Sequence, residues 1–290
     1  MSPTLAESPQ SISSRGRIAI VLSAGYFGFF AHAGFMLAVE ELGIDYHCIA
    51  GSSAGAIVAA LHASGLPAKQ IIDLLLRVNR KDFWDSTGAL AIIKALLRKG
   101  RGWTGLLKGD RFEQMIEEVL PVKRFEDCER SLYITAFNLS KGVDQTFDSG
   151  TIADKVRASC SYPYLMTPKA IDGSKYWDGG FLAKVPIETM IEREKPERVV
   201  VHYLATRETA DFAASNWSAV AMLEAALGAA RREIESHRIK AVGREYANLH
   251  WITPEVPPVG PKDLSSGKGA VDAAYAQAIK RLPRILDISK

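Results

Sequence analysis

The chain has 290 residues, 47% of them hydrophobic, and a formal net charge of +3 at pH 7, a composition typical of a soluble globular protein with a sizeable core. A charge this mild, without zinc-finger spacing or interleaved basic and aromatic residues, gives no reason to expect a nucleic-acid partner. The three cysteines, Cys48, Cys128 and Cys160, are far apart and odd in number, which favours reduced thiols and a cytoplasmic protein.

The N-terminal residues 1–16 are polar and lack the apolar core of a signal peptide, so we expect a disordered tail followed by a single domain over residues 17–290. Residues 18–39 then contain no Asp, Glu, Lys or Arg, which is long enough to span a bilayer. The β-branched start of this run and the glycines that interrupt it favour a buried strand, a turn and a buried helix instead. We therefore predict a strand over residues 17–22 and a helix over residues 29–42.

The second strand leads into Gly51-Ser-Ser-Ala-Gly55, a G-x-S-x-G pattern. In this pattern a serine occupies a tight turn between a strand and a helix, with its hydroxyl exposed. Glycine is needed on both sides because a Cβ would collide where the strand end meets the helix start. The apolar residues 46–50 and the small-residue helix predicted over 54–63 supply that context, so Ser53 is the candidate nucleophile. The alternative is a turn in which Ser52 or Ser53 only caps the helix.

A short turn, Ser23-Ala-Gly-Tyr-Phe-Gly28, follows the first predicted strand. Two parallel strands joined by one helix form a right-handed crossover, so the turns after both strands lie side by side. The backbone N–H groups of Ala24, Gly25 and Tyr26 can then point at the oxyanion of an acyl group that Ser53 attacks. A plain tight turn is the alternative.

Residues 67–120 have helical periodicity, with helices predicted over 69–78, 89–99 and 112–120. The stretch 89–108 combines an apolar face with a basic one that carries Lys94, Arg98 and Arg101. Such a helix can lie on an anionic lipid surface, which would make the protein peripheral to a membrane. More often such a stretch is an ordinary surface helix whose apolar side packs on the core.

The rest of the chain alternates strands and helices. The predicted strands cover 131–138, 143–147, 198–204 and a segment ending at Trp251. The predicted helices cover 151–159, a segment opened by Pro186, 216–245 and 270–288. Residues 171–180 contain two Asp-Gly turns, and the second of them is Asp178-Gly-Gly180.

A serine hydroxyl requires a neighbouring base to attack at neutral pH. His237 or His250 fits the chain order of an α/β-hydrolase triad, but only one strand and one helix precede the strand of Ser53, fewer than that fold usually has. Asp178 is the stronger candidate because the two glycines after it let the backbone turn sharply and approach another segment. Partial desolvation would raise its pKa above the ordinary value of about 3.9 and make it a better base. The other histidines lie in apolar runs and are expected in the core: His32, His47, His62 and His202.

In this ordered combination, residues 17–204 resemble the patatin-like phospholipases. Members of that family have a glycine-rich oxyanion turn after the first strand, G-x-S-x-G after the second, and D-G-G or D-G-A far downstream, with a Ser–Asp dyad and no catalytic histidine. The resemblance implies a three-layer α/β/α fold with a mainly parallel central sheet, Ser53 as nucleophile and Asp178 as base. It also implies hydrolysis of a lipid or other carboxylic ester, of the phospholipase A, lysophospholipase or carboxylesterase type, without a metal or organic cofactor. The glycines that support the motifs are Gly28, Gly51, Gly55, Gly179 and Gly180.

The oxyanion turn departs from the family pattern Gly-Gly-Gly-x-Arg/Lys-Gly. Small residues replace two glycines, and Phe27 stands at the basic position. Backbone donors survive these changes, whereas the lost cation weakens the expectation of phosphate contacts. The bulky side chains predict an apolar acyl site and neutral ester or lipid substrates: Tyr26, Phe27, Phe29 and Phe30. An acyltransferase on the same site and a lipid-binding protein that has lost the chemistry are the alternatives, and no oligomeric state follows from these residues.

Overall fold

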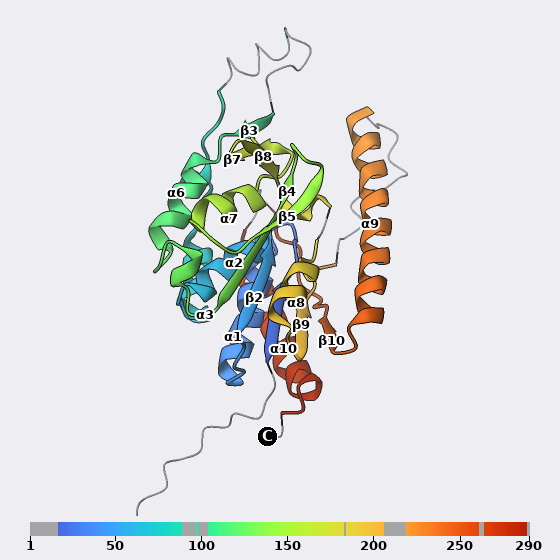
Figure 1. Cartoon of the computed structure of the whole chain (residues 1–290). Coiled ribbons are helices and arrows are strands. Elements are labelled where there is room, and N and C mark those ends of the chain that lie inside the picture. The colour runs from blue at the N-terminus through green and yellow to red at the C-terminus, as the bar shows by residue number, and fades with distance from the viewer. Residues whose placement is uncertain are drawn as a thin grey trace, which may run out of the picture.

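The structure, a computed structural model, describes residues 17–88, 97, 104–182, 184–205, 219–260 and 264–288. Its centre is an eight-stranded sheet with the order β10-β9-β1-β2-β4-β8-β7, in which β5 also pairs with β4 (Figure 1). The strands that run parallel are β1 (Ile18–Leu22), β2 (Cys48–Ser52), β4 (Ser131–Asn138), β9 (Arg198–His202) and β10 (Leu249–Ile252). The strands added antiparallel at one end are β5 (Val143–Phe147), β7 (Lys169–Ile171) and β8 (Ser174–Trp177).

Strand β1 is buried on both faces of the sheet. Side chains alternate between the two faces along a strand. Ile18, Ile20 and Leu22 belong to one buried cluster, and Ala19 and Val21 belong to a second one. Every residue of this strand therefore has to be apolar, which explains the uninterrupted hydrophobic run at its position in the sequence.

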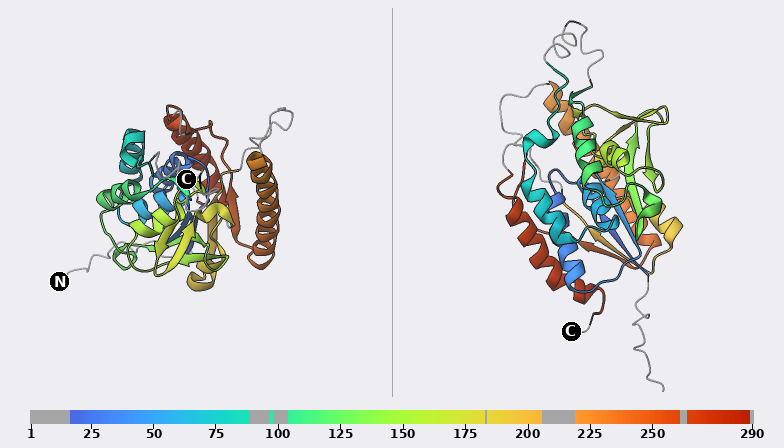
Figure 2. Two further views of the ribbon diagram at one scale, coloured as in Figure 1. Left: turned by 90° about the horizontal axis from the view of Figure 1, so that it is seen from above. Right: turned by 90° about the vertical axis from the view of Figure 1, so that its left-hand side faces the viewer.

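Helices cover both faces of the sheet. The helices on the first face are α1 (Phe29–Glu41), α2 (Ala54–Ala63), α3 (Ala68–Arg77), α6 (Asp110–Val119) and α10 (Gly267–Ile285). The helices on the second face are α8 (Glu188–Glu194) and α9 (Ala219–Glu245). The view from above in Figure 2 has α10 and α9 on opposite sides of β10. The predicted three-layer α/β/α arrangement with a mainly parallel sheet is confirmed.

Helix α1 accounts for the rest of the charge-free run. Nine of its thirteen residues are buried, since it packs between the sheet and α10. At Gly34 a Cβ would lie 2.2 Å from the carbonyl oxygen of Val271 in α10, so the two helices approach too closely for any larger residue. In the described part of the chain no helix is both long and apolar enough to cross a bilayer.

Most predicted elements appear within a few residues of their predicted bounds, and the ranges of α2, β4 and β5 agree with the prediction. Two short parallel strands were not predicted, β3 (Gly105–Leu107) and β6 (Tyr164–Met166), because three residues are too few for a pattern to develop. The short helical segments are α4 (Arg80–Phe83), α7 (Ala153–Ser159), η1 (Phe125–Asp127) and η2 (Gly179–Phe181). The predicted tail over 1–16 and the predicted helix over 89–99, apart from Leu97, lie outside the described residues.

Candidate active site

Ser53 lies at the sharp turn between β2 and α2. Its φ of 51° and ψ of −118° are unusual for a residue with a side chain, and such strain is concentrated at functional sites. Its side chain makes no capping hydrogen bond to α2, which argues against a purely structural N-cap. A Cβ at Gly51 would lie 2.5 Å from the carbonyl oxygen of Gly55, and a Cβ at Gly55 would lie 2.2 Å from that of Leu22. Both glycines of the pattern are therefore required by the close approach of the backbone.

The carboxylate of Asp178 accepts a hydrogen bond from the hydroxyl of Ser53. Ser53 Oγ donates to Asp178 Oδ2 at 2.7 Å, and the N–H of Gly180 donates to Oδ1 at 2.8 Å. A Cβ at Gly179 would lie 2.1 Å from the carbonyl oxygen of Thr135, so the Asp-Gly-Gly turn also packs directly on the sheet. The structure thus brings together two side chains that are 125 positions apart in the sequence.

Asp178 is only 5% exposed. Burial raises its pKa from 3.8 to about 6, although the hydrogen bonds from Ser53 and Gly180 and the positive charge of Arg231 in α9 act in the opposite direction. Since a general base works best when its pKa is close to the working pH, a carboxylate in this environment is much better suited to accept a proton than an exposed aspartate.

A third segment, the end of α7, holds the backbone around both side chains. Ser159 Oγ accepts from the N–H of Ser53 at 2.8 Å and donates to the carbonyl of Thr135 at 2.6 Å. The carbonyl of Ser161 accepts from the N–H of Asp178 at 3.0 Å. These serines were not among the predicted site residues. The only signal for them in the sequence was their position within the stretch that resembles the family.

Arg157 fixes α7 in turn. It is 2% exposed, and its guanidinium donates to the carbonyls of Gly109, at 3.0 Å, and Thr167, at 2.9 Å. The buried guanidinium therefore links α7 to the segments at Gly109 and Thr167.

The turn after β1 lies beside Ser53 because β1 and β2 are parallel neighbours, with Leu22 in register with Gly51. The N–H of Ala24 already donates to the carbonyl of Lys184 at 2.7 Å, so this predicted oxyanion donor is occupied. Within the described residues the N–H groups of Gly25 and Tyr26 have no acceptor. The predicted set of three donors is therefore reduced to two.

A family model described as patatin-like phospholipase matches residues 20–191. The chain belongs to this family. The matched segment contains the end of β1, the turn after it, Ser53, α7 and Asp178.

Several proteins from other organisms are similar to part of this chain. The uncharacterized protein YqhO of Bacillus subtilis is 33% identical over 208 residues, which cover 65% of this chain and 71% of that protein. An uncharacterized NTE family protein of Mycobacterium tuberculosis is 28% identical over 175 residues, 60% of this chain and 46% of that protein. Lysophospholipase NTE1 of Saccharomyces cerevisiae is 28% identical over 184 residues, 63% of this chain but 10% of that protein. This chain therefore spans less than half of the NTE family relatives.

Among solved structures, VipD from Legionella pneumophila is similar with a TM-score of 0.55 and 16% sequence identity, over 94% of this chain and 67% of VipD. At this identity the comparison supports the patatin-like fold alone.

The aromatic residues of the turn occupy two environments. Phe30 is 1% exposed and packs in the core against Gly267, so its predicted place in an acyl site is wrong. Tyr26 is 63% exposed, and its ring centroid lies 4.9 Å from that of Phe27 and 6.4 Å from that of Tyr162. Tyr26 and Phe27 of the turn and Tyr162, which follows α7, therefore form an aromatic rim.

The two histidines of the triad alternative lie on elements other than those that carry Ser53 and Asp178. His237 is exposed on α9, where it pairs with Glu233 at 3.0 Å, and His250 lies in β10, three strands from β2. The prediction that the other histidines lie in the core is confirmed for His32, His62 and His202. In the described part of the chain no histidine hydrogen-bonds to Ser53 or Asp178.

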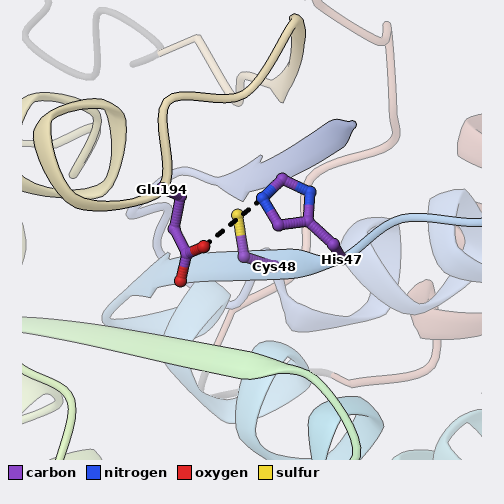
Figure 3. A group of neighbouring side chains, drawn as sticks. All are labelled: His47, Cys48 and Glu194. Carbon is purple, nitrogen blue, oxygen red and sulfur yellow. Dashed lines mark ion pairs between the residues drawn. The ribbon is translucent and has the colours of Figure 1, made fainter. Parts of the chain in front are cut away.

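One cluster has donor atoms suited to a metal: His47, Cys48 and Glu194 converge from the start of β2 and the end of α8 (Figure 3), with their ligand atoms within 4.8 Å of one another. The carboxylate of Glu194 has partners within the protein, because Arg17 pairs with it at 3.0 Å and the Tyr133 hydroxyl donates to it at 2.7 Å. Burial and the nearby carboxylate raise the pKa of Cys48 to about 12, which keeps it a thiol. Glu194 is therefore part of an ion-pair network with Arg17 and His47, at the end of β2 away from Ser53.

Proposed function

We propose that the chain hydrolyses carboxylic esters of lipids by acyl transfer through Ser53, with Asp178 as general base. The observation that carries the proposal is the 2.7 Å hydrogen bond from Ser53 Oγ to a carboxylate that is almost completely buried. Membership of the patatin-like phospholipase family and the lysophospholipases among its relatives support lipid esters as the substrate class.

In the proposed reaction Asp178 accepts the proton of Ser53 as its Oγ attacks the ester carbonyl. The N–H groups of Gly25 and Tyr26 donate to the oxyanion that forms, aided by the positive end of the α2 dipole. The intermediate collapses, the ester C–O bond breaks, and Asp178 returns its proton to the leaving alcohol. Water, deprotonated by Asp178, then releases the acyl group as a carboxylic acid and regenerates Ser53.

The substrate preference follows from the turn. Phe27 stands where the family pattern has a cation, and the aromatic rim has no positively charged side chain, so we propose that neutral lipid esters are preferred over anionic ones. A monoacylglycerol and a lysophosphatidic acid with the same acyl chain provide the direct comparison, and a lower kcat/KM for the monoacylglycerol would contradict this preference.

The decisive experiment is labelling with a fluorophosphonate probe beside a panel of lipid esters. We expect the wild-type chain to react with both and the Ser53→Ala variant to lose turnover by about 10³-fold or more. Ser52→Ala is the matched control, because the neighbouring hydroxyl is buried and has no hydrogen-bond partner among the described residues. Equal losses in the two variants, or an unlabelled wild-type chain, would refute the proposal. Adding an alcohol acceptor and analysing the products distinguishes hydrolysis from acyl transfer.

A further inference from the structure

Two imidazoles lie in contact behind the oxyanion turn. His32 in α1 and His202 at the end of β9 are both 0% exposed, and their Nδ1 atoms are 2.8 Å apart. His32 Nε2 lies 2.8 Å from the carbonyl oxygen of Ser23. The ring of His202 stacks on Phe35, with 4.4 Å between the ring centroids. Neither histidine has a part in the proposed reaction.

The hydrogen atoms of this pair can be assigned from chemistry alone. A carbonyl oxygen only accepts, so His32 Nε2 carries a proton and donates to Ser23. A neutral imidazole has one N–H, so His32 Nδ1 accepts, and His202 Nδ1 must donate to it. His202 Nε2 is then an unprotonated nitrogen, and it is buried with no hydrogen-bond partner among the described residues.

Both rings remain neutral at physiological pH. Burial lowers the pKa of His32 to about 3, with Lys184 contributing in the same direction and the carbonyl of Ser23 opposing. Burial also lowers the pKa of His202 far below its ordinary value. The direction of the hydrogen bonds, from His202 to His32 to Ser23, is therefore fixed.

Ser23 is the residue on which the oxyanion turn is anchored. Its N–H donates to the carbonyl of His202 at 3.2 Å, and its Oγ accepts from the N–H of Leu204 at 2.9 Å and donates to the carbonyl of Ala24 at 3.1 Å. The side chain of Leu204 packs so closely on the turn that a Cβ at Gly28 would lie 2.1 Å from it. The serine that replaces the first glycine of the family pattern thus ties the turn to the end of β9.

We propose that His32 and His202 are positioning residues that orient the oxyanion turn through the carbonyl of Ser23. This inference rests on the proposed function, because Gly25 and Tyr26 lie two and three residues after Ser23. A hydrogen bond that is buried in a low-dielectric interior holds its partners firmly, and a misplacement of about 1 Å at a catalytic group costs about 10²-fold in rate. Oxyanion donors act mainly in the transition state, so losing their alignment lowers kcat rather than raising KM.

The variant His32→Phe keeps an aromatic ring in the helix and removes both hydrogen bonds. We expect kcat to fall about 10-fold to 100-fold, KM to change less than about threefold, and fluorophosphonate labelling of Ser53 to slow in parallel. The matched control is His62→Phe. His62 is also buried with two polar partners, since its Nδ1 lies 2.6 Å from the Tyr46 hydroxyl and its Nε2 lies 2.9 Å from Glu40 Oε1. It lies at the end of α2 that is far from Ser53. An equal fall of kcat in both variants would overturn the proposal.

A double variant covers the case in which His32→Phe does not fold. His32→Phe with His202→Phe removes the donor that the single change leaves unpaired, so it restores stability without restoring a donor to Ser23. We expect kcat to stay low in the double variant, and a return to the wild-type kcat would overturn the positioning role.

Nitrogen-15 NMR of the imidazoles tests the assignment without turnover. We expect His32 as the Nε2–H tautomer and His202 as the Nδ1–H tautomer, unchanged between about pH 5 and 8. The opposite tautomers, or a ring that gains a second proton in this range, would overturn the hydrogen-bond chain whatever the activity. If the wild-type chain shows the expected tautomers but turns over no ester, the proposed function is refuted together with the positioning role that rests on it.

Discussion

The variant Asp178→Asn should lose activity and gain stability. It removes the buried charge and keeps the shape of the side chain, because the amide oxygen can accept from Gly180 and the amide nitrogen can donate to Ser53 Oγ. The amide accepts no proton, so turnover should fall by about 10² to 10⁴-fold, the usual contribution of a general base.

The stability gain follows from the pKa of Asp178. The folded state raises this pKa from 3.8 to about 6, so ionisation of the carboxyl group opposes folding. The penalty is absent below pH 3.8, grows as the pH rises, and above pH 6 amounts to about 3 kcal/mol, since each pKa unit corresponds to about 1.4 kcal/mol. The Asn variant should exceed the wild type by up to this amount at pH 8 and lose its advantage near pH 4.

Urea unfolding at pH 4 and pH 8, followed by tryptophan fluorescence, measures both differences in the free energy of unfolding. The matched control is Asp172→Asn, in the other Asp-Gly turn of the same segment, where the side chain is exposed and we expect changes below about 0.5 kcal/mol. A destabilised Asp178→Asn variant at pH 8, or a stability difference that does not depend on pH, would refute the reasoning. In the wild type the same pKa predicts that kcat/KM on an uncharged ester rises about tenfold per pH unit below pH 6 and levels off above it.

Substitutions around the site give further tests. Gly55→Ala should lower the Tm and abolish fluorophosphonate labelling of Ser53. Its control is Gly243→Ala, at an open position of α9, which should add about 0.5–1 kcal/mol of stability. Similar Tm shifts in the two variants would contradict the close approach at the turn. Arg157→Met leaves carbonyls unpaired and should cost about 2–4 kcal/mol in urea unfolding, and a cost below about 1 kcal/mol would argue against its anchoring role. Because burial raises the pKa of Cys48 and Cys160, iodoacetamide at pH 7.5 should alkylate them only after unfolding, and mass spectrometry would reveal early reaction in the folded protein.

The two turns that carry Ser53 and Asp178 were predictable from their glycines together with the resemblance to the family. Parallel pairing of β1 and β2 was predictable because two apolar strands joined by a single helix form a right-handed crossover. These patterns are short and local, so they can be recognised in a single sequence.

The contacts that hold the motifs together were not predictable. The hydroxyl of Ser159 reaches the N–H of Ser53 across 106 positions, and no spacing rule connects them. The N–H of Ala24 was expected from the sequence to be available to an oxyanion, but it donates to the carbonyl of Lys184. Such pairings are decided by tertiary packing between distant segments, so they appear only when the sheet and the loops at its edge are assembled.

The distance along the chain between Ser53 and Asp178 also has a consequence during protein synthesis. At about 5–20 residues per second, a ribosome needs on the order of ten seconds to add the 125 residues that separate them. Under the proposed mechanism a nascent or prematurely terminated chain would carry an unactivated hydroxyl throughout that interval. The cell's own lipids would then meet a reactive serine only after β8 has joined β4 and the last part of the site has been delivered.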